Sequence, residues 1–124
     1  MSNYVVWIDT DHAQLFELHE DAATHKESLK RHEVRHHHRA EKEKLHHQHS
    51  DHFFHEVAGH LREANQILLI GPGNAKKLFQ GHLRDHHHAT LMNKVIGMET
   101  CDHPTDGQIV AFGKKFFKTH QIHG

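Results

Sequence analysis

The chain has 124 residues, which suits one layered domain with a single core and is too short for two. Its 15 Lys and Arg nearly balance 16 Asp and Glu, and its 20 histidines make the net charge depend strongly on pH, because an unperturbed imidazole titrates near pH ~6.5. The single cysteine, Cys101, excludes an internal disulfide and a cysteine zinc cluster, and no apolar run approaches the ~20 residues that cross a bilayer. We therefore expect a cytoplasmic protein that is not exported and has no membrane partner.

The first elements in chain order are β-strands. Tyr4–Ile8 is β-branched and aromatic, Asp9–His12 is typical of a turn, and Ala13–Leu18 resumes the strand pattern. Together these segments predict a β-hairpin. A third strand is predicted over Ser28–Arg35.

A helix is predicted after a polar segment. Apolar residues recur at helical spacing from Phe53 to Ala64, and Ser50 or Asp51 is available as an N-cap. The continuous apolar run Gln66–Ile70 then suits a strand that is buried on both faces.

A turn and a short helix follow that strand. Gly71-Pro72-Gly73 ends the strand, and Asn74 can cap a helix that runs to about Leu83. Lys94–Thr100 is predicted to form another strand. The residues of the short helix that we expect to face inward are Ala75, Leu78, Phe79 and Leu83.

The chain closes with an amphipathic helix. Thr105 and Gln108 have the spacing of a capping box, in which two side chains satisfy backbone N–H groups reciprocally. The apolar residues of the helix are Ile109, Val110, Phe112, Phe116 and Phe117. The order β-β-β-α-β-α-β-α predicts a single α/β domain, a mixed β-sheet with helices packed on its faces.

The histidines are the first candidates for chemistry. Imidazoles three or four positions apart share one helix face and can bind one Zn²⁺ or Ni²⁺ ion. A metal-binding protein is therefore one hypothesis, whereas a solvated polar surface that needs no cofactor explains the same residues more simply. The candidate ligands are His46, His49, His52, His55, His82 and His86.

Two other positions suggest chemistry. Asp9, at the end of the first strand, invites the hypothesis of a divalent-metal nuclease, although Asp is also favoured in hairpin turns. The corner after the buried strand opens a helix, so its backbone N–H groups and the helix dipole could bind an anion, although a structural turn explains the same pattern. The residues of this corner are Gly71, Gly73, Asn74 and Lys76.

Three strings resemble the central domain of the archaeal and eukaryotic peptide-chain release factors and of Pelota. ILLIGPGNAKKLFQGHL (Ile67–Leu83) is similar to its strand, Gly-Pro-Gly turn and helix, VVWIDTDHAQLFEL to its opening hairpin, and KVIGMETCDHPTDGQIVAF to its later strand and terminal helix. The resemblance covers roughly residues 3–118. It implies a ribonuclease-H-like fold for residues 1–124, as in bacterial single-domain relatives called translational machinery proteins, and a role near the ribosome.

The resemblance also implies what this chain lacks. Release factors hydrolyse peptidyl-tRNA with a Gly-Gly-Gln loop between the third strand and the long helix, and the corresponding segment here, about 35–49, reads RHHHRAEKEKLHHQH. Pelota-type relatives lack that loop and act by occupying the ribosome. We therefore expect a protein that is not an enzyme and that binds the ribosome or RNA. The contact residues, which can neutralise phosphates or stack on bases, are expected to be Arg35, His36, His37, His38, Arg39, Lys42 and Lys44.

Overall fold

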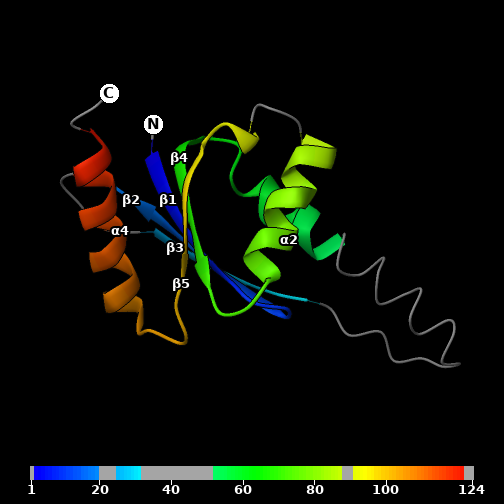
Figure 1. Cartoon of the computed structure of the whole chain (residues 1–124), viewed down its shortest axis with the longest axis horizontal. Helices are drawn as coiled ribbons and strands as arrows, with labels where there is room; N and C mark the ends of the chain where they lie inside the picture. The colour runs from blue at the N-terminus through cyan, green and yellow to red at the C-terminus, as the bar shows by residue number, and fades with distance from the viewer. Residues whose placement is uncertain (1, 20–24, 32–51, 88–90, 122–124) are drawn as a thin grey trace, which may run out of the picture.

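One mixed β-sheet forms the centre of the structure, a computed structural model that describes residues 2–19, 25–31, 52–87 and 91–121. Its five strands lie in the order β3-β2-β1-β4-β5 (Figure 1). β2 is antiparallel to both β1 and β3, whereas β4 joins β1 and β5 joins β4 in parallel. This arrangement confirms the single α/β domain with a mixed sheet predicted from the sequence. In chain order the strands are β1 (Ser2–Ile8), β2 (His12–Leu18), β3 (His25–Lys30), β4 (Ala64–Gly71) and β5 (Val95–Thr100).

β1 lies at the centre of the sheet, and its sequence suits burial on both faces. Val6 and Ile8 contribute to the apolar core on one side, and Val5 and Trp7 contribute to the core on the other. All four side chains are buried. β-Branched and aromatic residues favour such a strand because they pack well on a pleated surface.

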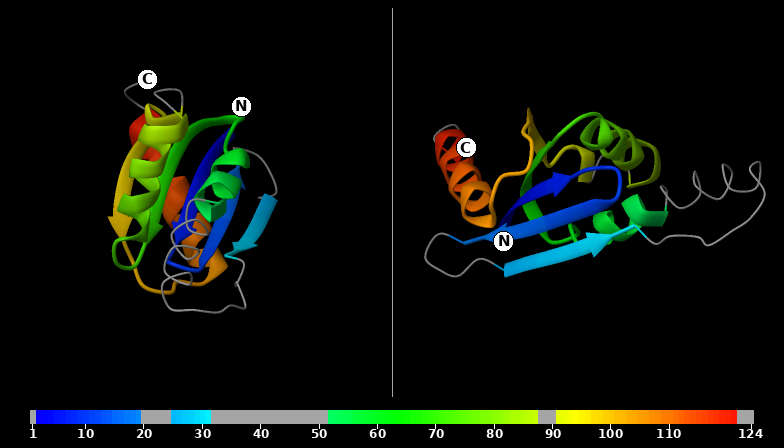
Figure 2. Two further views of the ribbon diagram at one scale, coloured as in Figure 1. Left: turned by 90° about the vertical axis from the view of Figure 1, so that its right-hand side faces the viewer. Right: turned by 90° about the horizontal axis from the view of Figure 1, so that it is seen from below.

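Helices cover both faces of the sheet, which gives the molecule three layers (Figures 1 and 2). The helical segment 52–59 and α2 (Ala75–His82), which continues into the π-helical turn η1 (Leu83–His87), cover one face. α4 (Asp106–Gln121) covers the other face. The first core includes Val6, Ile8, Leu15, Phe53, Phe54, Val57, Leu61, Leu69, Phe79 and Leu83. The second core consists of Val5, Trp7, Phe16, Leu18, Leu68, Ile70, Ile109 and Phe117.

α4 approaches the sheet closely because it places a glycine against it. Gly113 is buried, and a Cβ atom at this position would collide with Cγ2 of Val5 and lie 2.9 Å from Cδ1 of Leu18. The absence of a side chain at Gly113 therefore sets how near α4 can lie to β1 and β2.

Three predicted elements have the wrong bounds. The third strand is His25–Lys30 rather than Ser28–Arg35, because pairing with β2 sets its register, with Leu29 opposite Ala13. Residues 32–35 lie outside the described part of the chain. The helix predicted to reach Ala64 ends at residue 59, and Ala64 is instead the first residue of β4, two positions before the predicted start. The predicted N-caps, residues 50 and 51, lie outside the described residues.

Two apolar side chains face solvent, and one of them, Leu78, was predicted to face inward. Leu78 of α2 is 63% exposed. Lys76, on the same helix, is only 3% exposed. Phe112 of α4 is 42% exposed. In both helices the neighbouring strands, rather than the hydropathy of one residue, set the buried face.

The capping box of α4 is confirmed. The Thr105 N–H group donates to Oε1 of Gln108 (2.9 Å), and the Gln108 N–H group donates to Oγ1 of Thr105 (3.2 Å). Within the ranges that the structure describes, none of the helices combines the length and the apolar character needed to cross a membrane.

Candidate functional site

The carboxyl ends of the parallel strands β1, β4 and β5 meet at one edge of the sheet. Ligands of open α/β sheets commonly bind beyond such ends. Gly71 has a φ of 149°, and a Cβ atom there would collide with the carbonyl oxygen of Ile8. The Cys101 N–H group donates to the Gly71 carbonyl oxygen (3.1 Å). The close approach of Gly71 to Ile8 and the hydrogen bond from Cys101 join the ends of the three strands.

The predicted anion-binding corner lies at this edge. Gly71, Gly73, Asn74 and Lys76 form the turn from β4 into α2, and Gly73 adopts a left-handed φ of 60°. Nζ of the buried Lys76 donates to the Gly73 carbonyl oxygen (2.6 Å). The Asn74 carbonyl oxygen accepts hydrogen bonds from the N–H groups of residues 77 and 78 (3.0 Å each). The Lys76 ammonium group therefore stabilises the turn itself, and binding of an anion would rest on the backbone N–H groups.

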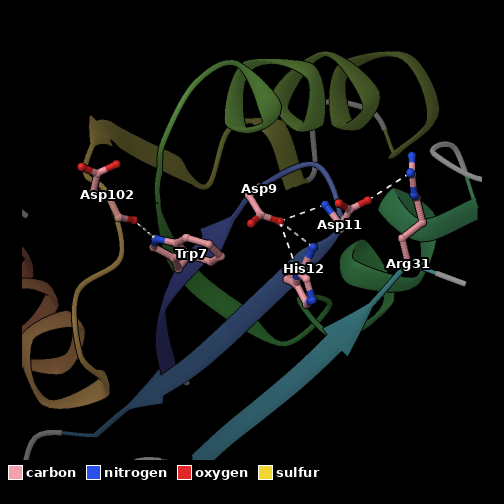
Figure 3. A network of polar contacts seen from close by, with 6 residues as sticks. All are labelled: Trp7, Asp9, Asp11, His12, Arg31 and Asp102. Atoms are coloured by element: carbon pink, nitrogen blue, oxygen red, sulfur yellow. Dashed lines mark hydrogen bonds and ion pairs between the residues drawn. The ribbon is translucent and has the colours of Figure 1, made fainter.

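The turn between β1 and β2 is held by its own side chains (Figure 3). Oδ1 of Asp9 accepts hydrogen bonds from the N–H groups of Asp11 (2.8 Å) and His12 (2.6 Å). Asp11 pairs with Arg31, just beyond β3, at 3.0 Å. Asp9 is thus explained by the turn. No group of three His, Cys, Asp or Glu side chains in the described part of the chain could hold a metal ion, which leaves the nuclease hypothesis without a metal cluster there.

Trp7 and Cys101 close the edge of the sheet toward α4. The indole N–H group of Trp7 donates to the Asp102 carbonyl oxygen (2.9 Å; Figure 3), and its ring lies 5.3 Å from the His103 ring. Burial raises the pKa of the Cys101 thiol, although a hydrogen bond between the thiol itself and the Gly71 backbone acts in the opposite direction. A raised pKa disfavours the reactive thiolate.

Some of the candidate metal ligands come close to one another. His82, at the end of α2, is buried, and its ring centroid lies 4.6 Å from that of His86 and 6.2 Å from that of His55. His52 lies on the same helical segment as His55. His46 and His49 lie outside the described residues. The rings of His55 and His86 therefore both lie near the ring of His82. Among the residues described, however, no three side chains are arranged so that they could bind a metal ion.

The predicted RNA contact residues lie outside the described part of the chain. They fall between Lys30, where β3 ends, and residue 52, where the next helix is first described. These residues are Arg35, His36, His37, His38, Arg39, Lys42 and Lys44. The segment that contains them thus connects the third strand to the following helix, which is the interval that the family resemblance indicates.

Comparisons with known proteins reveal a relation at the level of the fold. No family model matches the sequence, and no curated protein matches it. The structure is similar to that of an archaeal translation termination factor, aRF1, with a TM-score of 0.60 and 15% identity over 98% of this chain. It is also similar to Pelota from Thermoplasma acidophilum, with a TM-score of 0.61 and 20% identity over 90% of the chain. Pelota from Archaeoglobus fulgidus matches 92% of the chain with a TM-score of 0.55 and 17% identity.

These likenesses confirm, for the fold, the resemblance to release factors and Pelota that the sequence indicates. The chain spans only 40% of the length of aRF1 and 31% of the length of each Pelota protein. The comparison therefore concerns one part of those longer proteins.

A further group of basic residues was not predicted from the sequence. Lys114, Lys115 and Lys118 are exposed on α4, which has a single acidic residue, Asp106, in its first turn. The signal in the sequence is three lysines at helical spacing in a segment without later carboxylates. The basic residues at 35–44 are more closely spaced, so they form a stronger signal in the sequence than the three lysines of α4.

Proposed function

We propose that this protein is a translation-related protein that associates with the ribosome or its RNA without catalysing hydrolysis. The observation that carries the proposal is the likeness in fold to aRF1 and to two Pelota proteins over at least 90% of the chain. The first of these is a translation termination factor, and the family resemblance in the sequence implies a role at the ribosome.

Two observations support binding without hydrolysis. The sequence contains no Gly-Gly-Gln, and its only Gly-Gln pair is Gly107-Gln108. The side chain of Gln108 accepts a hydrogen bond from the Thr105 N–H group, so a helix cap accounts for that glutamine. The polar side chains at the carboxyl edge of the sheet, Asp9 and Lys76, are likewise engaged with backbone groups of their own turns.

The segment at about 35–49 has the chemistry of a conditional phosphate contact. Its cations Arg35, Arg39, Lys42 and Lys44 can neutralise phosphates, whereas Glu41 and Glu43 oppose that attraction. The histidines add positive charge as the pH falls toward 6. Binding should therefore be modest at neutral pH and stronger in mild acid.

Co-sedimentation of the full chain with purified ribosomes tests the proposal. We expect association at about 50 mM salt and pH ~6.5 that weakens on raising either the salt concentration or the pH, because phosphate contacts and imidazole charge are both lost. Replacing Arg35, Arg39, Lys42 and Lys44 by Gln should weaken association at least tenfold at low salt, by the loss of about four phosphate contacts. The matched variant Glu41→Gln/Glu43→Gln should strengthen it. Absence of association at low salt and pH ~6.5 would contradict the proposal.

A further inference from the structure

The outward side of α4 carries a group of lysines. Ile109, Gly113 and Phe117 are buried against the sheet, and they recur at intervals of four as expected for one helix face. At 3.6 residues per turn, Lys115 and Lys118 fall on the opposite side and Lys114 on the flank next to Lys118, and all three are exposed. Lys114 and Lys118 are four positions apart, and Lys115 and Lys118 three, so their side chains are neighbours.

Acidic residues do not neutralise this group. After Asp106, α4 contains no Asp or Glu. Asp106 itself pairs with Lys26 of β3 at 2.7 Å, away from the lysines. Within the described part of the chain, no ion pair joins Lys114, Lys115 or Lys118 to a carboxylate. Three neighbouring ammonium groups without a counter-charge form a surface complementary to phosphates.

The helix dipole accounts for only part of this pattern. Cations stabilise the C-terminal end of a helix, but the effect falls off within the last turn. Lys118 lies in the last turn of α4, which ends at Gln121, whereas Lys114 and Lys115 lie before it. Like charges at neighbouring positions also cost the helix some stability. A partner of opposite charge explains all three lysines together.

An exposed aromatic ring lies beside one of these lysines. Phe112 is 42% exposed and precedes Lys115 by three positions, so the two side chains are neighbours on the helix surface. Lysines that neutralise phosphates next to an aromatic ring that stacks on a base are the combination found in proteins that bind single-stranded nucleic acid.

We propose that Phe112, Lys114, Lys115 and Lys118, named here the α4 lysine face, bind single-stranded RNA. The lysines contact consecutive phosphates, and Phe112 stacks on one base. Figures 1 and 2 show that, among the described elements, α4 is the helix that lies on this side of the sheet. This inference rests on the proposed function, because ribosomal RNA would supply the ligand, and it adds a contact on the face of the sheet opposite α2.

Fluorescence anisotropy of the full chain with a labelled oligouridine tests the inference. The variant Lys114→Gln/Lys115→Gln/Lys118→Gln should lower the slope of log affinity against log salt by about 2, since each phosphate contact on a single strand contributes about 0.7. At about 0.1 M salt its affinity should fall at least tenfold. Phe112→Ala should weaken binding about fivefold or more with an unchanged salt slope, because stacking is not ionic. Thermal unfolding followed by circular dichroism verifies that each variant is folded.

The matched control removes the same charge elsewhere. Arg62→Gln/Lys77→Gln/Arg84→Gln eliminates three exposed cations, from α2, η1 and the turn before β4. It should lower affinity much less than the α4 variant. Equal losses in the two triple variants, absence of RNA binding by the unaltered chain at low salt, or binding to anionic lipid vesicles in place of RNA would each overturn the inference. Ribosome association that persists while the α4 variants bind RNA normally would overturn this inference alone and leave the proposed function standing.

Discussion

The two faces of the sheet are covered in different ways and carry different kinds of charge. On one face, two helical segments supply Phe53, Phe54 and Phe79 to a large core, and their surroundings are rich in histidine. On the other face, α4 packs alone, close to the strands at Gly113, and its outward side is rich in lysine. Histidine as a residue type gains charge only in mild acid, whereas lysine is charged throughout the neutral range. The comparison teaches that one small domain can carry two different kinds of basic residue on opposite sides of its sheet.

We expect the largest loss of stability when a fully buried aromatic residue of the first core is replaced. Phe79 is completely buried and makes an edge-to-face contact with Phe54, with ring centroids 5.6 Å apart. Phe79→Ala should lower the free energy of unfolding by about 3–5 kcal/mol, measured by urea denaturation, because it removes buried area and leaves a cavity. The adjacent Leu78 faces solvent, so Leu78→Ala should change stability by less than about 0.5 kcal/mol. Similar losses in the two variants would show that α2 is not oriented as described.

A smaller effect is expected where α4 meets the sheet. Gly113→Ala forces a methyl group against Val5 and Leu18, and such overpacking costs about 1–3 kcal/mol. Alanine favours a helix over glycine by up to about 1 kcal/mol, which offsets part of this cost. The free energy of unfolding should therefore fall by up to about 2 kcal/mol, measured by thermal or urea unfolding. Gly107→Ala is the control, because a methyl group at that position would have no neighbour within 4 Å and only the helical gain applies. A Gly113→Ala variant as stable as Gly107→Ala would argue against the close approach of α4.

The smallest effect is expected at the surface link between β3 and α4. Nζ of Lys26 and Oδ2 of Asp106 lie 2.7 Å apart, with 37% and 54% of the two side chains exposed. Solvent screens such a pair, so Lys26→Gln should cost less than about 1 kcal/mol at low salt and almost nothing at about 1 M NaCl. A double-mutant cycle with Asp106→Asn isolates the pair from the favourable effect of Asp106 on the helix dipole. A coupling energy that is unchanged at high salt would contradict an exposed ion pair.

Sequence patterns predicted the elements that are specified by local chemistry. Asp9 binds the backbone of its own turn, and Thr105 and Gln108 cap α4 reciprocally, so short-range signals were sufficient for the hairpin and the terminal helix. The glycine pattern after β4 was equally readable, because Gly73 adopts a left-handed φ. The fold class followed from the order of these elements.

Features that depend on residues distant in the sequence could not be predicted from local patterns. The bounds of β3 are set by pairing with β2, and the single apolar position Leu29 could not define that register. Lys76 is buried because its ammonium group reaches the Gly73 carbonyl oxygen, a contact that hydropathy does not reveal. The lysines of α4 became a candidate surface only when the buried side of the helix was known.

The central position of β1 also dictates an order of events while the chain is being synthesised. One edge of β1 pairs with β2, the next strand to emerge, and local pairing of this kind forms quickly. Its other edge can pair only after β4 has been synthesised, because Trp7 pairs with Ile70. Joining two residues that are so far apart in the sequence is slow. Until then, the nascent chain exposes an apolar strand edge that invites pairing with other chains. Once β4 has paired with β1, its own other edge stays unpaired until β5 is added, so the sheet is complete only after β5 has been synthesised.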